Sequence, residues 1–387
     1  MSLDKILINA ANVTGAGANA LTKSLLPPLT RSLPSAAFTI LLPVACKAWN
    51  CEAMDNVRVV YFPAERGIRN DLQRLRQLFF EVRSYAIEGQ ADVCLTLGDM
   101  PPLGLPSPSV ILLHQALLVY RPKEIAGITP WPWYKRTYLR THFRLSARKA
   151  DRVIVQTDVM RARLARTCGI ASEKISVIPQ PPPMHVSTQP NSDTPSLIRR
   201  NPKPIKLTYL AAYYPHKNHG ILPAVGAELR RRHLADKVQI FTTINLDRCR
   251  SKSIRDCYVE FADVITNIGP VNSSDVPGIL RDSSALFFPT LLECFSLVYI
   301  EALNLGLPIL TSNRDFAHAS CGNMARYFDP LSATSIVDCI QEFSASGKPA
   351  NYEHLAKEEL RRFPPDWDAA ANLFGDVLKQ VTDKAHA

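Results

Sequence analysis

The chain has 387 residues, of which 46% are hydrophobic and 21% are charged, a length and composition typical of a soluble protein with two or three domains. No run of about 18 apolar residues occurs, which excludes a membrane-spanning helix, and we expect no secretion signal because the N-terminus leads almost directly into a strand. The nine cysteines form no Cys-x2-Cys pair, which favours reduced thiols in a cytoplasmic protein over disulfides or zinc.

The positive charge is concentrated in the first half of the chain. Residues 1–184 hold 23 basic and 13 acidic residues, whereas residues 185–387 hold 22 of each, so the net charge of +10 belongs to the first half. We therefore expect the first half to face an anionic partner, such as a membrane surface or a lipid diphosphate.

The first half alternates apolar strands with helical segments, which is typical of a parallel α/β sheet covered by helices. The predicted strands are 5–9, 37–42, 57–62, 92–97, 110–114, 151–157 and 174–179, and the predicted helices are 18–26, 70–88 and 158–168. Together they predict an N-terminal Rossmann-like domain over 1–184.

Two places in this half are candidate ligand contacts. Gly15 and Gly17 lie in the turn between the first strand and helix, where glycine lets the backbone approach a ligand closely. His114 follows a strand, at the edge where open α/β sheets bind ligands. The alternatives remain a simple tight turn and a structural histidine.

Residues 129–150 contain six basic residues, no acidic residue and several aromatic residues. This mixture suits an interfacial segment that touches anionic headgroups. The alternative is an amphipathic helix packed on the sheet with its basic face in water. No nucleic-acid-binding motif is present, so no nucleic-acid partner is expected. The candidate membrane or acceptor surface comprises Trp131, Trp133, Lys135, Arg136, Arg140 and Arg144.

Residues 185–204 are rich in Pro, Ser, Thr and Asn, which predicts a linker. A second Rossmann-like domain is predicted over 205–365, and a C-terminal helix over 366–387 is expected to cross back to the first domain. The predicted strands of the second domain are 205–210, 238–244, 264–269, 285–290 and 308–311. The predicted helices are one that follows residue 219 and runs to about 232, and those over 276–280, 296–305, 332–345 and 351–362.

A strand-to-helix turn in the second domain carries Pro215, His216, Lys217 and Asn218. A cation beside a helix N-terminus can hold a departing diphosphate, because both contribute positive potential there.

The most informative stretch contains two glutamates, Glu293 in a loop and Glu301 inside a helix that ends at Gly306. The helix N-terminus, at Phe295, Ser296 and Leu297, offers free N–H groups and a positive dipole to a phosphate. Carboxylates beside it would repel phosphate but bind hydroxyl groups, so a sugar nucleotide fits both features. The alternative is a solvated acid on an ordinary amphipathic helix.

The spacing Glu293-x7-Glu301, with Gly306-Leu-Pro308 after it, resembles the Glu-x7-Glu motif of the retaining glycosyltransferases of family 4. The stretches 311–316 and 321–330 also resemble that family. The resemblance is good over about 205–345 and weaker but collinear elsewhere. It implies the GT-B fold, in which two Rossmann-like domains with parallel sheets face a central cleft.

The resemblance also implies roles for individual residues. Glu293 would bind the donor-sugar hydroxyls, Glu301 the ribose hydroxyls, and Lys217 the diphosphate. Ala212 stands where the family has a second cation, an arginine, in its Gly-Arg-x4-Lys motif. The family implies that His114 lies near the donor sugar and that the glycine turn lies near the acceptor, across the cleft from the donor diphosphate. Phe295, Ser296, Leu297, Asn218, Gly15 and Gly17 complete the candidate donor-binding set.

By this resemblance the chain is a cytoplasmic retaining glycosyltransferase that moves a sugar from a nucleotide-sugar donor to a hydroxyl of a glycan or lipid-linked glycan. Such transfer would serve lipopolysaccharide or other cell-surface polysaccharide assembly, with peripheral contact at the inner membrane. We identify no Asp-x-Asp motif of the metal-dependent GT-A type and expect neither metal nor cofactor. The alternatives are a sugar-nucleotide epimerase of the same fold and a non-catalytic scaffold, which the missing arginine keeps open.

Overall fold

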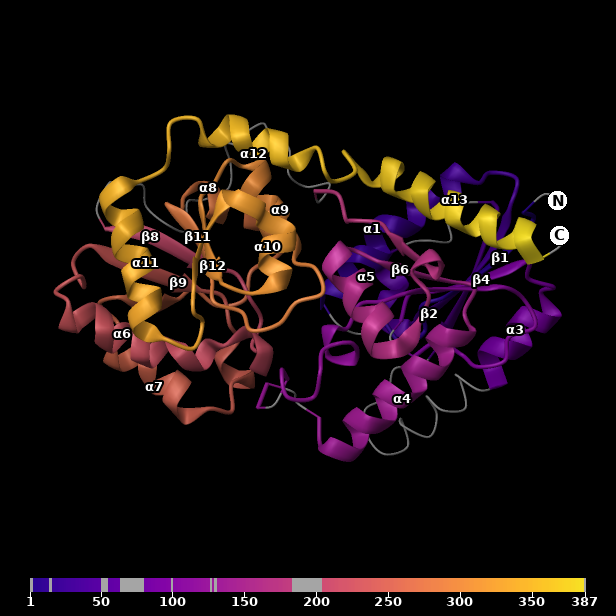
Figure 1. Cartoon of the computed structure of the whole chain (residues 1–387), viewed down its shortest axis with the longest axis horizontal. Coiled ribbons are helices and arrows are strands. Elements are labelled where there is room, and N and C mark those ends of the chain that lie inside the picture. The colour runs from indigo at the N-terminus through magenta and orange to yellow at the C-terminus, as the bar shows by residue number, and fades with distance from the viewer. Residues whose placement is uncertain are drawn as a thin grey trace. The chain divides into compact units, whose positions relative to one another are not determined.

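The structure, a computed structural model, describes residues 3–13, 16–49, 55–62, 80–98, 100–125, 127–128, 131–182 and 204–385. The chain divides into two compact units (Figure 1). The first unit comprises Met1–Glu124, Trp131–Pro181 and Pro364–Ala387, and the second comprises Ile125–Pro130 and Pro182–Phe363. Apart from Pro204, the predicted linker over 185–204 lies outside the described residues, as do Gly15 and the first part of the predicted helix 70–88.

The first unit is built on a parallel sheet with the strand order β3-β2-β1-β4-β5-β6-β7. Its strands are β1 (Lys5–Asn9), β2 (Ala37–Pro43), β3 (Val57–Phe62), β4 (Val93–Thr96), β5 (Ser109–Leu112), β6 (Arg152–Val155) and β7 (Ile175–Val177). Its helices are α1 (Ala16–Ser32), α3 (Val82–Glu88), α4 (Trp133–Lys149), α5 (Asp158–Leu164) and α13 (Trp367–Ala385).

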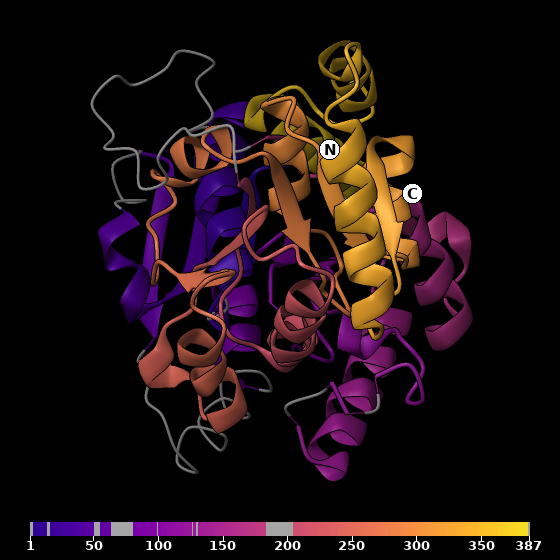
Figure 2. The same cartoon turned by 90° about the vertical axis from the view of Figure 1, so that its left-hand side faces the viewer.

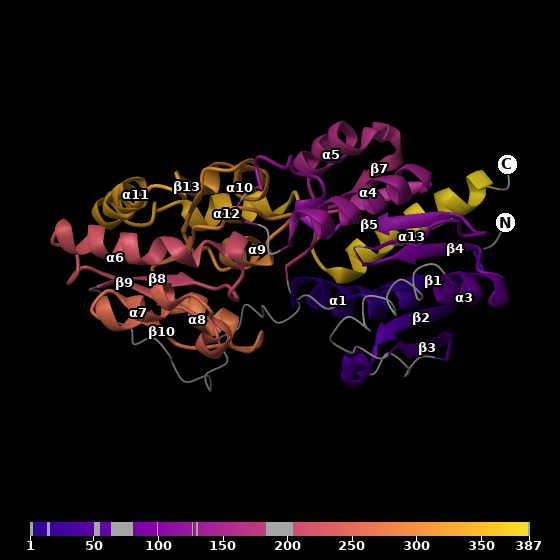
Figure 3. The ribbon, with the colours of Figure 1, turned by 90° about the horizontal axis from the view of Figure 1, so that it is seen from below.

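The second unit is built on a parallel sheet with the order β10-β9-β8-β11-β12-β13, flanked on both sides by helices (Figures 2 and 3). Its strands are β8 (Ile205–Tyr209), β9 (Val238–Thr242), β10 (Ile265–Asn267), β11 (Ala285–Phe288), β12 (Ile309–Ser312) and β13 (Ala325–Phe328). Its helices are α6 (Leu222–Arg231), α7 (Lys252–Glu260), α8 (Val276–Arg281), α9 (Leu297–Asn304), α10 (Asp315–Cys321), α11 (Ala333–Ser346) and α12 (Tyr352–Leu360).

The continuous apolar strands explain both sheets. Every residue of β4 and of β11 is buried, because helices cover both faces of a parallel sheet. The strand order also fixes where ligand-binding residues can lie. In each sheet the first strand, β1 or β8, has its successors on both sides: the next two strands lie on one side and the later strands on the other. Open α/β sheets bind ligands at the carboxyl edge beside such a switch point.

The last helix completes the first unit. Helix α13 packs against α1 and touches β4 and β5, where Figure 3 shows it in yellow. Helix α1 runs to Ser32 rather than ending near Leu26 as predicted, although it contains Pro27 and Pro28. The Thr30 hydroxyl contacts the carbonyls of Leu26 and Pro27. These contacts, together with burial of the apolar face, keep the helix intact.

Candidate active site

The central feature of the second unit is an ion pair between Lys217 and Glu293. Lys217 lies in the short turn after β8, and Glu293 lies in the loop after β11, the strand that pairs with β8. The Lys217 Nζ atom is 2.6 Å from Glu293 Oε1, and the two side chains are only 16% and 9% exposed. The carboxyl edge of the sheet therefore brings together the two residues that the sequence singled out separately.

Hydrogen bonds connect the turn that carries Lys217 to the loop that carries Glu293. The Leu291 N–H donates to the His216 carbonyl at 2.7 Å. The Thr290 hydroxyl lies 3.1 Å from the same carbonyl and 2.6 Å from Glu293 Oε1. Because a hydroxyl has one hydrogen, it donates to only one of these acceptors at a time. Thr290 thus links the turn Pro215–Lys217, hereafter the lysine turn, to Glu293. No sequence motif indicated this role.

Glu301 lies in the second turn of α9, and its neighbours fix the orientation of that helix. Tyr299, which is fully buried, shares a hydrogen bond with Thr311 at 2.7 Å. The helix ends at Gly306, whose φ of +59° favours glycine, as the stop signal predicted. Burial raises the pKa of Glu301 from 4.5 to about 7. A ligand that donates hydrogen bonds to this carboxylate would offset the cost of burying its charge.

The N-terminus of α9 lies between the two glutamates in sequence. Ser296 is the N-cap residue, and its side chain makes no capping hydrogen bond. Phe295 and Leu297 are half-buried, and the Phe295 ring meets Phe363 edge-on. The helix has eight residues, enough for its aligned peptide dipoles to favour an anion at this end.

Asn218 follows Lys217 at the end of its turn. Its backbone is left-handed, with φ of +61°, and its side-chain amide donates to the carbonyls of Pro289 at 3.0 Å and Pro330 at 2.8 Å. Both amide hydrogens are therefore used inside the second unit. The contacts tie the lysine turn to two neighbouring loops, so Asn218 positions Lys217.

An aromatic stack contacts the lysine turn through a hydrogen bond. The His219 ring stacks on Tyr209 with centroids 4.6 Å apart, and the Tyr209 hydroxyl donates to the Lys217 carbonyl. Burial, together with the nearby Lys217 charge, lowers the pKa of His219 to about 3, so its ring is neutral. Ala212, at the position of the family arginine, is exposed.

In the first unit, His114 follows β5 at the carboxyl edge of the sheet. Its Nε2 atom is buried and has no hydrogen-bond partner within the described part of the chain. Burial lowers the pKa of His114 to about 4, although a hydrogen bond with the Leu97 backbone acts in the opposite direction. Gly17 lies in the first turn of α1, and a Cβ there would meet nothing within 4 Å.

The basic segment forms helix α4, at the lower edge of its unit in Figure 1. Trp133 is 72% exposed and Arg144 is exposed, whereas Trp131, Lys135 and Arg136 are half-buried. Arg140 points inward, because its guanidinium donates to the carbonyls of Leu117 and Tyr120 at 2.8 and 2.5 Å. No helix among the described residues is both long and apolar enough to cross a membrane.

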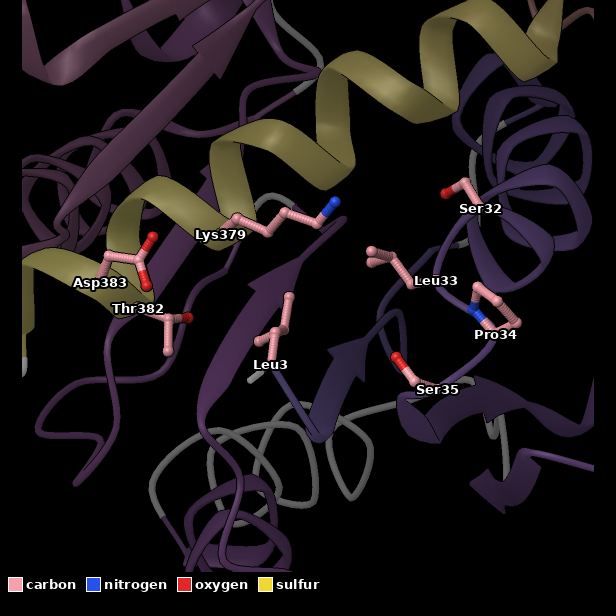
Figure 4. A pocket seen from close by; sticks show the side chains of 8 residues that line it. All are labelled: Leu3, Ser32, Leu33, Pro34, Ser35, Lys379, Thr382 and Asp383. Atoms are coloured by element: carbon pink, nitrogen blue, oxygen red, sulfur yellow. The ribbon is translucent and has the colours of Figure 1, made fainter. Parts of the chain in front are cut away.

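A hollow of about 380 Å³ lies between the start of β1, the end of α1 and α13 (Figure 4). Leu3 precedes β1, and Ser35 precedes β2, so this hollow is at the amino edge of the sheet. His114 lies at the carboxyl edge. The hollow is therefore separate from the candidate site.

The chain contains one Asp-x-Asp sequence, Asp366-Trp367-Asp368. Asp366 accepts a hydrogen bond from the Ala369 N–H at the start of α13, and Asp368 pairs with Arg31 at 2.9 Å. Trp367 is buried. The sequence is thus a helix start. Within the described ranges no three His, Cys, Asp or Glu side chains converge as a metal site, and metal independence stays a prediction.

Comparison with known proteins shows which family this chain resembles. Residues 38–181 match the family model described as Glycosyltransferase Family 4. The O-antigen chain mannosyltransferase RfbU of Salmonella typhimurium is 23% identical over 267 residues, which cover 66% of this chain and 68% of that protein. The comparisons therefore confirm the resemblance to glycosyltransferase family 4 that the motif around Glu293 predicted. The family model matches the first half, where the motif resemblance was weaker.

Solved structures confirm the predicted GT-B fold. Sucrose-phosphate synthase from Thermosynechococcus elongatus has a TM-score of 0.71 at 15% identity, covering 98% of this chain and 100% of that one. Anabaena Alr3699/HepE, solved in complex with UDP-glucose, has a TM-score of 0.66 at 16% identity, covering 97% and 99%. At these identities the likeness establishes the fold alone.

Proposed function

We propose that this glycosyltransferase transfers a sugar, with retention, from a nucleoside-diphosphate donor to a hydroxyl of a lipid-linked glycan. The observation that carries the proposal is the buried Lys217–Glu293 pair at the carboxyl edge, which joins the turn after β8 to the loop that leads into α9 and Glu301. The site offers a cation and a helix N-terminus for a diphosphate, and two carboxylates for hydroxyl groups.

Each residue has a defined task in this reaction. The bond between the anomeric carbon and the diphosphate oxygen breaks, and its electron pair leaves with the diphosphate. Lys217 has N–H groups beyond the one facing Glu293, and these stabilise that developing charge. The acceptor oxygen bonds to the anomeric carbon on the same face, and its proton passes to the leaving diphosphate. Glu293 orients the donor sugar through its hydroxyls.

Glu301 and His114 complete the donor contacts in this proposal. The ribose hydroxyls of the nucleotide would donate to the Glu301 carboxylate, whose burial otherwise raises its pKa to about 7. For His114 we keep the role that the family resemblance implies, a contact to the donor sugar. The relative RfbU is named a mannosyltransferase, which makes mannose the first sugar to test, with GDP-mannose as its usual activated form.

The acceptor is proposed to lie in an anionic membrane at the cytoplasmic face, and α4 is the surface that meets it. On α4 the exposed residues Trp133, Tyr134, Tyr138 and Leu145 are 72%, 62%, 43% and 47% exposed. Tyr134, Tyr138 and Leu145 lie at helical spacing on one face, with exposed Arg144 beside them. Because residues 129–150 contain no acid, aromatic insertion and attraction to anionic headgroups act together.

The membrane proposal is tested by sedimentation with phosphatidylglycerol vesicles, with neutral phosphatidylcholine vesicles in parallel. A double change of Tyr134 and Tyr138 to Ser should release the protein from the anionic vesicles. The matched control is Phe80→Ser, which changes an aromatic residue that is 68% exposed outside α4. The proposal would be overturned if the α4 variant and the wild type bound the anionic vesicles equally, or if the wild type bound anionic and neutral vesicles equally.

The donor proposal is tested by a thermal-shift panel containing UDP-glucose, GDP-mannose and the free nucleoside diphosphates. A ligand at 100 times its Kd should stabilise the protein by about 2.7 kcal/mol. We expect one nucleotide family to stabilise the wild type and Lys357→Ala, an exposed control in α12, but not Lys217→Ala. Stabilisation by none of them, or equal stabilisation of Lys217→Ala, would contradict the proposal.

A further inference from the structure

The Lys217–Glu293 pair leaves the candidate diphosphate site short of positive charge. Lys217 is paired at 2.6 Å with a carboxylate that is almost fully buried, so the two formal charges cancel. Ala212 contributes no charge where the family has its arginine. A diphosphate brings about two negative charges, and a second positive group beside Lys217 would balance them.

His216 is placed to supply that group. It precedes Lys217 in the same turn, and its carbonyl accepts hydrogen bonds from the loop that carries Glu293. Its half-buried ring stacks on Tyr214, with centroids 5.5 Å apart and an interplanar angle of 19°. Neither ring nitrogen of His216 has a hydrogen-bond partner among the residues that the structure describes. The stack therefore orients the imidazole and leaves its nitrogens for a ligand.

The charges around this ring determine how it would respond to an anion. Burial lowers the pKa of His216 to about 4; the Glu293 charge acts to raise it, and the Lys217 charge acts to lower it. The other titratable neighbours are Tyr214, on which it stacks, and His219, which is itself neutral because its pKa is about 3. Without a ligand the ring is thus neutral at pH 7, yet within electrostatic reach of both members of the ion pair.

We propose that His216 is the second cation of the diphosphate site: it takes up a proton from solvent when the nucleoside diphosphate binds beside Lys217, and it releases that proton when the nucleotide leaves. This inference rests on the proposed function, because it needs a diphosphate at this turn. His216 would thereby supply part of the charge that the arginine supplies in other family members, but only in the bound state.

The size of the effect follows from simple electrostatics. A close opposite charge raises a histidine pKa by roughly 1–3 units, so a bound diphosphate would bring His216 from about 4 to about 6. Binding at pH 6 would then take up about half a proton. The linked protonation would strengthen binding about fourfold at pH 5.5 and hardly at all at pH 8.

The experiment is isothermal titration of wild type and His216→Gln with UDP and GDP, in buffers of different ionisation enthalpy at pH 5.5, 6 and 8. His216→Gln should lose about half a proton of uptake at pH 6 relative to wild type. It should bind about fourfold more weakly at pH 5.5 and within twofold at pH 8. Because each comparison is with wild type, protons released by Glu301 cancel.

Two further variants keep the result interpretable. His216→Arg carries a fixed charge, so it should take up no proton and bind the diphosphate at least about tenfold more tightly than wild type at pH 8. His354→Gln, whose side chain is 75% exposed on α12, should match wild type. Nucleotide binding with equal proton uptake in His216→Gln overturns this inference and leaves the proposed function intact. Failure of wild type to bind any nucleotide overturns both.

Discussion

Replacing Glu301 with Gln separates the stability of the second unit from its ability to bind a nucleotide. Burial raises the pKa of Glu301 from 4.5 to about 7, so the folded protein disfavours its carboxylate. Since one pKa unit corresponds to about 1.4 kcal/mol, this shift corresponds to at most about 3 kcal/mol. The folded state binds more protons than the unfolded state between these values, so stability falls as pH rises from 4.5 through 7.

Glutamine has the same shape without the charge and does not lose this free energy. Glu301→Gln should therefore match wild type near pH 4.5 and exceed its free energy of unfolding by up to about 3 kcal/mol at pH 8.5. The assay is urea unfolding of the nucleotide-free protein at both pH values. Nucleotide binding should weaken in the same variant, because the amide has one uncharged accepting oxygen, whereas the carboxylate can accept one ribose hydroxyl on each of two charged oxygens.

Glu342→Gln is the matched control, because Glu342 lies on α11 and its side chain is exposed to solvent. Its unfolding free energy should differ little from wild type at either pH. If Glu301→Gln were less stable than wild type at pH 8.5, or if it bound nucleotide normally, the assignment of Glu301 as a buried ribose-binding carboxylate would be wrong.

Four further outcomes are expected. Lys217→Ala should lower kcat/KM for donor turnover by about 10²–10³-fold, because a group aimed at developing charge is lost. Asn218→Ala should destabilise the protein by roughly 2 kcal/mol in urea unfolding, because two buried carbonyls lose their donor. Arg140→Ala should lower the melting temperature without changing vesicle binding, whereas Arg144→Ala should weaken vesicle binding without changing the melting temperature. Ala212→Arg should tighten nucleoside-diphosphate binding at pH 8 by at least about tenfold, since it restores a fixed cation.

Each of these outcomes has a result that would refute it. Normal turnover by Lys217→Ala would remove the lysine from the mechanism. An Asn218→Ala protein as stable as wild type would mean that its amide contacts do not hold the turn. If vesicle binding were lost in Arg140→Ala but kept in Arg144→Ala, the assignment of Arg140 to the inner side and Arg144 to the exposed side of α4 would be wrong. Unchanged nucleotide affinity in Ala212→Arg would place the diphosphate elsewhere.

The fold was accessible from the sequence because its signals are local. Continuous apolar strands between helical stretches predict a parallel sheet, and Gly306, with φ of +59°, marks the end of α9 as expected. Where local signals conflict with packing, the prediction failed. Helix α1 was expected to end near Leu26, but it continues through Pro27 and Pro28 to Ser32, and Leu29 beyond the two prolines is fully buried.

The site was predictable only in part, because pairing depends on which strands are neighbours. Lys217 and Glu293 each stood out by residue type and place, but they are 76 residues apart along the chain, and their ion pair requires β8 to lie beside β11. Thr290 and the stack of His219 on Tyr209 carry no motif at all. Arg140 and Arg144 are four residues apart on α4, and what separates them is that Arg140 contacts the carbonyls of Leu117 and Tyr120, so composition alone assigned both to the surface.

The central claim is that this chain transfers a sugar from a nucleotide donor through the pair at Lys217 and Glu293. The most direct measurement is release of nucleoside diphosphate from GDP-mannose and UDP-glucose by wild type, Glu293→Gln and the exposed control Glu342→Gln, followed with a coupled assay. The account predicts turnover of one donor by wild type and the control, and a loss of at least about 10²-fold in Glu293→Gln. No turnover of either donor, or equal turnover by all three proteins, would contradict it.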